Sequence, residues 1–144
     1  MKWAITIARM LLGLVFFVFG LNGFLGFMPL PEMGAEAGAF MGALGATGYM
    51  FPLIKITEVT AGALLLSGRL VPLALVALAP VVLNIFVFHV FLDPAGLPMT
   101  VVLTALGSFV AWAYRDSYRS LFVVSSKPVI ARANSAGVPA TEAA

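Results

Sequence analysis

The sequence contains no cysteine and very little charge. Only 10% of its 144 residues are Asp, Glu, Lys or Arg, whereas a typical soluble domain has about 25%. Without cysteine the chain forms no disulfide, thiolate nucleophile, cysteine-ligated zinc site or iron–sulfur cluster. So little charge cannot cover a water-facing surface, which excludes soluble enzymes, DNA-binding modules and disordered regulators. The net charge of +2 also gives no field that would attract a polyanion.

Apolar side chains take the place of the missing charge. Hydrophobic residues make up 62% of the chain and the mean hydropathy is +1.08, so the lipid bilayer is the expected solvent. A membrane-crossing helix needs about 20 mostly apolar residues. Three segments with uncharged apolar centres meet this requirement, at about residues 5–28, 70–92 and 97–115.

A fourth span is predicted at about residues 50–67, and it carries two charges. The uncharged run between Glu58 and Arg69 is too short to cross a bilayer, but the apolar pattern begins earlier, at Met50. A helix long enough to cross therefore takes Lys55 and Glu58 into the membrane. The predicted fold class is an all-α integral membrane protein, an antiparallel four-transmembrane-helix bundle.

Two turn signals and one longer segment connect the spans. Gly68-Arg69 and the Asp93–Gly96 segment, with Pro94 in it, both predict tight turns. Residues 29–49 form the predicted outer loop. Part of this loop could lie on the membrane interface as a short amphipathic helix, or all of it could be plain loop. Its larger apolar residues are Met33, Phe40, Met41 and Leu44.

The cations predict the orientation of the bundle. Seven of the eight fall on one side of a four-span arrangement, and the eighth is Lys55, inside the second span. The seven are Lys2, Arg9, Arg69, Arg115, Arg119, Lys127 and Arg132. Because Lys and Arg are enriched on the cytoplasmic side, both termini are expected there. Residues 120–144 are then a cytoplasmic tail, and their Ala/Ser/Gly/Pro-rich composition predicts that they are largely disordered.

Five polar side chains are predicted to lie at one depth, in the outer half of the bilayer. They are Asn22, Lys55, Glu58, Asn84 and His89. At a rise of about 1.5 Å per residue, they occupy a band roughly 5–13 Å from the outer ends of three helices. A charge in mid-helix costs about 2.5–3.5 kcal/mol, so such residues usually face the bundle interior and mark function.

The two charged residues of the second span are spaced to pair. Lys55 and Glu58 are three positions apart, on one face of a helix. They could form an ion pair that only neutralises itself, or Lys55 could reach outward to the interface. In the functional interpretation, Glu58 lines a polar cavity as a catalytic group. His89, the only histidine, could be the second catalytic group or simply an interfacial residue bonded to a loop.

The asparagines have a structural and a ligand-binding interpretation. Asn22 and Asn84 could hold helices together through side-chain hydrogen bonds. Asn84 follows Pro80, which removes a backbone donor and is expected to kink the third span, opening a pocket opposite Glu58. In the functional interpretation, Asn22, Lys55 and Asn84 bind the ligand. No metal site is predicted.

Glycines recur along the first two spans. They are Gly13, Gly20, Gly23, Gly26, Gly62 and Gly68. In membrane helices, glycine lets two backbones approach closely. These positions are therefore expected to serve helix packing.

Several of these residues resemble the DoxX and DoxX-like family of small bacterial membrane proteins. The likeness covers roughly residues 5–119. Its most specific part is the block from Glu58 through Gly62 to Arg69; weaker matches are Arg9, Leu12-Gly13, Phe16, Gly20 and the runs from Asn84 to His89 and from Phe91 to Pro98. The resemblance implies a four-helix bundle in a bacterial inner membrane and an association with oxidoreduction and quinones. Because the chain has no cysteine, a thiol-based role does not carry over.

Three functions fit the sequence. The first is a membrane component of an oxidoreductase system that binds a quinone or a similar small apolar molecule in an outer-leaflet polar pocket, and it is favoured by the resemblance. The second is non-catalytic binding or transport of a small molecule or lipid. The third is a structural subunit of a larger complex, with partner subunits or a second copy as neighbours. No covalently bound cofactor and no nucleic-acid partner are expected.

Overall fold

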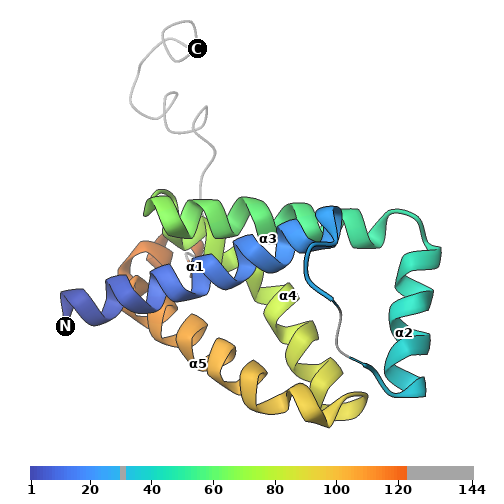
Figure 1. Ribbon diagram of the computed structural model, residues 1–144. Coiled ribbons are helices and arrows are strands. Elements are labelled where there is room, and N and C mark those ends of the chain that lie inside the picture. The colour runs from blue at the N-terminus through green and yellow to red at the C-terminus, as the bar shows by residue number, and fades with distance from the viewer. Residues whose placement is uncertain (30–31, 123–144) are drawn as a thin grey trace, which may run out of the picture.

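The computed structural model describes residues 1–29 and 32–122, and nearly all of them are helical (Figure 1). The α-helices are α1 (Lys2–Leu25), α2 (Ala35–Ala46), α3 (Met50–Ser67), α4 (Val71–Phe91) and α5 (Leu97–Ala113). Two 3-10 helices, η1 (Pro94–Gly96) and η2 (Arg115–Phe122), precede and follow α5. The predicted tail lies outside the described residues from residue 123 onward.

Four of these helices are long and apolar enough to cross a membrane. They are α1, α3, α4 and the continuous η1–α5 segment Pro94–Ala113. The prediction of an all-helical fold is therefore confirmed for the described residues, and four helices have the length and apolar character that a membrane span needs. The second span, α3, has the predicted bounds and carries both Lys55 and Glu58.

Two of the predicted packing glycines end helices instead. Gly26 adopts a left-handed conformation with φ 59°, and its N–H bonds the carbonyl of Asn22, so α1 ends at Leu25 rather than near residue 28. Gly68 ends α3 in the same way, with φ 72°. Glycine is favoured there because side chains with a Cβ rarely adopt positive φ.

Close packing of α1 on α3 depends on other glycines. A Cβ added to Gly13 would lie 3.0 Å from the Cβ of Leu65, and one added to Gly20 would lie 2.9 Å from the backbone nitrogen of Val59. These distances leave no room for a larger residue, which confirms the packing role of Gly13 and Gly20. Residues later in the sequence of α1 lie beside residues earlier in the sequence of α3. The two helices lie side by side in Figure 1.

The apolar core lies at the end of the molecule that holds the start of α1 and the turn from α3 to α4 (Figure 1). Its buried residues come from the first two thirds of α1, the second half of α3, the first half of α4 and from α5. They are Ala8, Leu12, Phe16, Ala61, Leu65, Val71, Ala74, Leu75, Leu78, Leu103 and Val110. At the opposite end the buried apolar cluster does not continue, and this leaves space between α3 and α4.

The predicted outer loop contains the short helix α2, which lies across that opposite end of the molecule (Figure 1). The segment is therefore helical and not plain loop, but its apolar side chains are spread around the helix and are not gathered on one amphipathic face. α2 contacts α3, and the ring of Phe40 lies 5.6 Å from the ring of Phe88 on α4, measured between centroids. α2 thus covers the space between α3 and α4.

Candidate functional site

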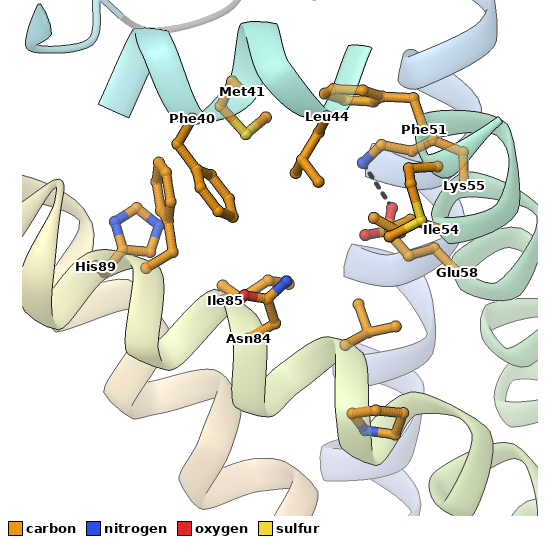
Figure 2. A pocket seen from close by; sticks show the side chains of 14 residues that line it. Phe40, Met41, Leu44, Phe51, Ile54, Lys55, Glu58, Asn84, Ile85 and His89 are labelled. Atoms are coloured by element: carbon orange, nitrogen blue, oxygen red, sulfur yellow. Dashed lines mark hydrogen bonds and ion pairs between the residues drawn. The ribbon is translucent and has the colours of Figure 1, made fainter. Parts of the chain in front are cut away.

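A cavity of about 360 Å³ lies between α2, α3 and α4 (Figure 2). Four of the five polar residues singled out in the sequence line it: Lys55 and Glu58 from α3, and Asn84 and His89 from α4. Figure 2 shows the Lys55–Glu58 pair and His89 on opposite sides of the cavity, with Asn84 between them. The volume is within the range of small-molecule sites, about 300–1,000 Å³.

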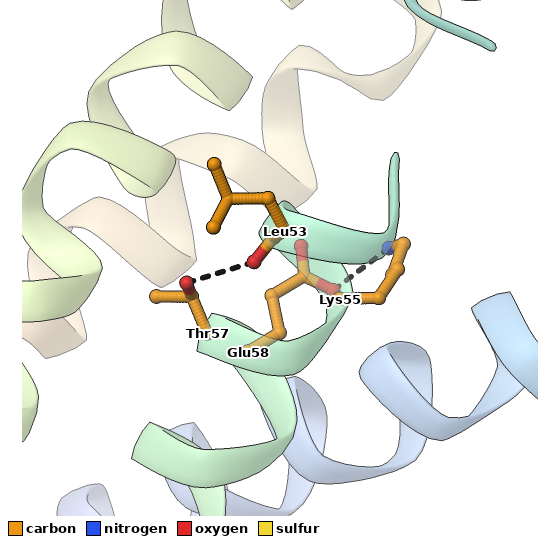
Figure 3. Close-up of polar contacts among 4 residues, drawn as sticks. All are labelled: Leu53, Lys55, Thr57 and Glu58. Carbon is orange, nitrogen blue, oxygen red and sulfur yellow. Dashed lines mark hydrogen bonds and ion pairs between the residues drawn. The ribbon is translucent and has the colours of Figure 1, made fainter. Parts of the chain in front are cut away.

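Lys55 and Glu58 form an ion pair at one side of the cavity. The Nζ of Lys55 donates to the Oε2 of Glu58 at 2.7 Å, as drawn in Figure 3. The side chain of Glu58 is 5% exposed and that of Lys55 is 19% exposed. The predicted pairing of these residues is therefore present, and it places a negative and a positive group together on the cavity wall.

Glycines of α1 make room for this ion pair. A Cβ added to Gly23 would lie 2.5 Å from the Cδ of Lys55, so the aliphatic part of that side chain lies against the bare backbone of α1. One turn earlier, a Cβ on Gly20 would lie 3.0 Å from the Cβ of Glu58. The packing of α1 on α3 thus fixes where the two charges stand.

His89 lies at the other side of the cavity, near the end of α4. Its Nδ1 is 2.9 Å from the backbone oxygen of Asp93 and 3.2 Å from that residue's carboxylate oxygen Oδ2. The imidazole meets the ring of Phe88 edge-on, with centroids 5.1 Å apart. The ring is therefore bonded to the loop after α4, as one interpretation expects, and it also lines the cavity. Its role as a catalytic group stays a prediction.

Asn84 lies between the two sides of the cavity, and its side chain makes no hydrogen bond to any described residue. Pro80, one turn earlier on α4, also lines the cavity. The amide of Asn84 is thus free to bond a guest as either donor or acceptor. Because Asn84 and His89 are five positions apart on one helix, they flank the space rather than meet at one atom.

Asn22 lies outside the cavity. Its Oδ1 accepts a hydrogen bond from the backbone N–H of Met28 at 2.6 Å, and its Nδ2 donates to the carbonyl of the same residue at 3.2 Å. The Asn22 side chain therefore satisfies the backbone N–H and carbonyl groups of Met28, which follows the end of α1. The sequence grouped Asn22 with the other polar residues, but its direction around α1 sends it to the loop and not to the polar residues of the cavity.

Aromatic and aliphatic side chains make up most of the cavity wall. Phe40, Leu44, Phe51, Ile54 and Phe88 all line it. Of the three phenylalanines at positions 86, 88 and 91, only Phe88 lines this space. The contribution of α2 depends on its position in the fold, and the sequence signal for it was only the spacing of a few large apolar residues.

A second cavity, of about 430 Å³, lies on α4 and α5. Its lining is apolar apart from the hydroxyls of Thr104 and Ser108, and it contains no ionisable side chain. It therefore offers no acid, base or charged group to a guest. The cavity between α2, α3 and α4, hereafter the polar pocket, is the better candidate for a functional site.

No family model, curated protein or solved structure matches this chain. The side chains that line the polar pocket are therefore the evidence for its chemistry. Among residues 1–29 and 32–122, no group of three or more His, Asp or Glu lies close enough to hold a metal ion. The pocket instead offers a carboxylate, an ammonium, an amide and an imidazole around an apolar space, which suits a guest with an apolar body and polar groups at its edges.

Proposed function

We propose that this protein is a DoxX-like, multi-pass protein of the bacterial inner membrane that binds a quinone or a similar small apolar molecule in the polar pocket. The observation that carries the proposal is the convergence of Lys55, Glu58, Asn84 and His89 on one cavity. Ionisable groups inside membrane-spanning helices are costly, and their gathering around one cavity favours ligand binding.

The pocket supports proton exchange with a bound ring. Glu58 and His89 are the catalytic groups of the proposal, because each can accept or give a proton at a ring oxygen. Lys55 pairs with Glu58 and offers further N–H donors, and Asn84 bonds the ligand between them. When bound, a quinone supplies the redox chemistry, and these four residues hold it and handle its protons.

The redox part of the proposal is drawn from the resemblance to DoxX-like proteins, and the chain is then one component of an oxidoreductase system. Its electrons come from a partner subunit or from another membrane protein. In this arrangement the four helices cross the inner membrane antiparallel, both termini are cytoplasmic, and the polar pocket opens towards the outer leaflet. Lys2, Arg9, Arg69, Arg115 and Arg119 support that orientation.

Mass spectrometry of the molecules that co-purify with the protein in mild detergent tests the proposal. We expect a quinone in about stoichiometric amount from the native protein and a large loss from the Glu58→Gln variant. Gly107→Ala is the matched control, since no atom lies within 4 Å of a Cβ placed there. Recovery of bulk phospholipid alone from the native protein would contradict the proposal and favour the structural-subunit alternative.

A second measurement distinguishes the oxidoreductase proposal from a protein that binds or transports the ligand without changing it. The oxidoreductase proposal expects a quinol-linked absorbance change with the intact protein in its native membranes, and no such change with Glu58→Gln. A ligand that binds stoichiometrically but never changes its redox state would instead favour the carrier alternative.

A further inference from the structure

The turn that follows α4 holds His89 in a defined orientation. The Nδ1 of His89 faces two oxygens of one residue, the backbone carbonyl of Asp93 at 2.9 Å and its carboxylate at 3.2 Å. Neither oxygen can donate a hydrogen bond when the carboxylate is ionised, so Nδ1 must carry the proton. In the neutral ring, Nε2 then has a free lone pair and accepts hydrogen bonds.

Gly96 fixes the plane of the same ring. A Cβ added to Gly96 would overlap the imidazole, with Cε1, Nδ1 and Nε2 of His89 as its nearest atoms. The backbone of Gly96 has φ −84° and ψ −4°, which any residue can adopt. Its lack of a side chain is therefore needed for the imidazole and not for the turn. The edge of Phe88 confines the ring from another side.

The opposite side of the pocket also has an acceptor. Glu58 receives the Lys55 ammonium on Oε2, and its other oxygen, Oε1, makes no hydrogen bond to any described residue. The charged groups that line the pocket with His89 are Lys55 and Glu58, and α2 contributes only apolar side chains to the lining. No other described ionisable residue lines the pocket, and Asp93 contacts His89 from outside the lining.

We infer that the Asp93–Gly96 turn makes the His89 side of the polar pocket a hydrogen-bond acceptor, so that the pocket prefers a ring that bears hydroxyl groups over the same ring with carbonyls. This inference rests on the proposed function, because it concerns the same pocket and narrows its ligand class. Asp93 and Gly96 are positioning residues, since they act through His89. The ligand class is a small apolar phenol or hydroquinone whose O–H donates to Nε2, with Glu58 able to accept a second O–H.

Three matched compounds test the preference: tert-butylhydroquinone, its oxidised form tert-butylbenzoquinone, and its dimethyl ether, which has no O–H. Their affinities for the full chain in lipid nanodiscs are measured by calorimetry under argon. We expect the hydroquinone to bind about tenfold tighter than either other compound, the amount expected for one lost hydrogen bond. Equal affinity of all three would overturn the inference and leave the proposed function standing, whereas binding of none would overturn both.

Variants then assign the preference to His89 and its turn. His89→Phe keeps a ring but removes the acceptor, and Gly96→Ala displaces the imidazole; both are expected to lower the ratio of hydroquinone to dimethyl-ether affinity to the part that Glu58 supplies. Gly107→Ala, with open space around the new methyl group, should keep the native ratio. A ratio, unlike an affinity, does not change when a variant lowers the folded fraction. A native ratio in Gly96→Ala would show that the turn does not set the preference.

A pH series gives a readout that a purely structural turn would not move. A protonated imidazole donates from both ring nitrogens, so Nε2 no longer accepts once acid protonates the ring. The preference for the hydroquinone should then shrink in the native protein and stay unchanged in His89→Phe. A preference that is independent of pH in the native protein would contradict the assignment to His89.

Discussion

At the scale of single residues, the ion pair of Lys55 and Glu58 is the costliest feature of the chain. Removing one partner of a buried pair leaves an uncompensated charge, which costs more than the pair itself contributes. The 2.7 Å contact and the low exposure of Glu58 place the pair in that regime.

A double-mutant cycle on this pair tests that cost. Lys55→Met alone should destabilise the protein by about 3 kcal/mol, because it leaves the Glu58 carboxylate buried without its partner. Lys55→Met combined with Glu58→Gln should be close to native stability, since no charge then remains. Unfolding by a denaturing detergent, followed by loss of helical circular dichroism, measures Lys55→Met, Glu58→Gln and the double variant. A single variant as stable as the double would show that Glu58 carries no charge that needs Lys55.

Tyr118 predicts a pH dependence outside the membrane-spanning helices. Its hydroxyl is buried without a hydrogen-bond partner among the described residues, and this burial raises the pKa of Tyr118 above its ordinary value of 10.0. The folded state therefore favours the neutral hydroxyl, and this contribution to stability is complete below about pH 10 and is lost as pH rises through the raised pKa.

The melting temperature should therefore fall more steeply above about pH 10 in the native protein than in Tyr118→Phe, which has no hydroxyl to ionise. The comparison is made at constant salt, and the other two tyrosines, Tyr49 and Tyr114, are present in both proteins. Parallel curves for the two proteins would mean that Tyr118 ionises as easily in the folded state as in the unfolded one.

At the scale of elements, the contact between α1 and α3 is set by backbone approach. A Cβ on Gly62 would lie 2.6 Å from the backbone nitrogen of Phe17, which cannot move without moving the helix. On the other side of the same helix pair, Arg9 of α1 donates to the carbonyls of Leu65 and Leu66 at the end of α3. Arg9 thus binds orphan carbonyls of α3 in addition to any role in orientation.

Gly62→Ala should push α1 and α3 apart and destabilise the protein by about 1–3 kcal/mol, the usual cost of overpacking. Gly107→Ala should be neutral or slightly stabilising, because it adds a methyl group to open space on a helix. Chemical unfolding in detergent compares the two variants with the native chain. Equal stability of the two would contradict close backbone contact at Gly62.

Gly23→Ala separates the position of the charges from the stability of the fold. The added methyl group meets only the flexible stem of Lys55, with no backbone atom among its three nearest neighbours. We therefore expect a smaller loss of stability than in Gly62→Ala, about 1 kcal/mol or less, together with weaker ligand binding because the ammonium shifts away from Glu58. The binding assay with tert-butylhydroquinone measures this, and native affinity would show that the stem of Lys55 does not need that space.

At the scale of the whole molecule, the core and the polar pocket lie at opposite ends. The buried apolar cluster holds the helices together at the end with most of the cations. The pocket lies where α3 and α4 separate and α2 covers the space between them (Figure 1). A stable end and an open end let the bundle keep a cavity without losing its packing.

The proposed topology predicts which ends are accessible from outside the cell. Because the chain has no cysteine, an introduced single cysteine is the only thiol in the protein that a maleimide can label. Ala95→Cys, in the turn after α4, should react with a membrane-impermeant maleimide in intact spheroplasts. Ser67→Cys and Ser117→Cys, at the other end, should react only after the membrane is opened. The reverse pattern would invert the orientation, and labelling of all three in intact cells would contradict a four-span crossing.

The sequence by itself determined the helices and the rarity of their charges. A membrane-spanning helix satisfies its backbone hydrogen bonds within one segment, so length and apolar content are enough to locate it. α3 was predicted with its observed bounds for this reason, and so was the pairing of Lys55 with Glu58, which depends only on their spacing in one helix.

Only the tertiary structure decided which polar residues share a space. A residue's position along its helix depends only on the local sequence. The direction of its side chain depends on how the helix is rotated against neighbouring helices that are far away in the sequence. The rotation of α1 directs Asn22 to Met28, whereas α4 directs Asn84 and His89 to the pocket. The roles of Gly23, Gly96 and α2 depend on the same packing, because a missing Cβ has meaning only beside the side chain that uses its space. The scarcity of charge therefore marks Lys55 and Glu58 in the sequence, and the packing of the helices places them with Asn84 and His89 in one pocket.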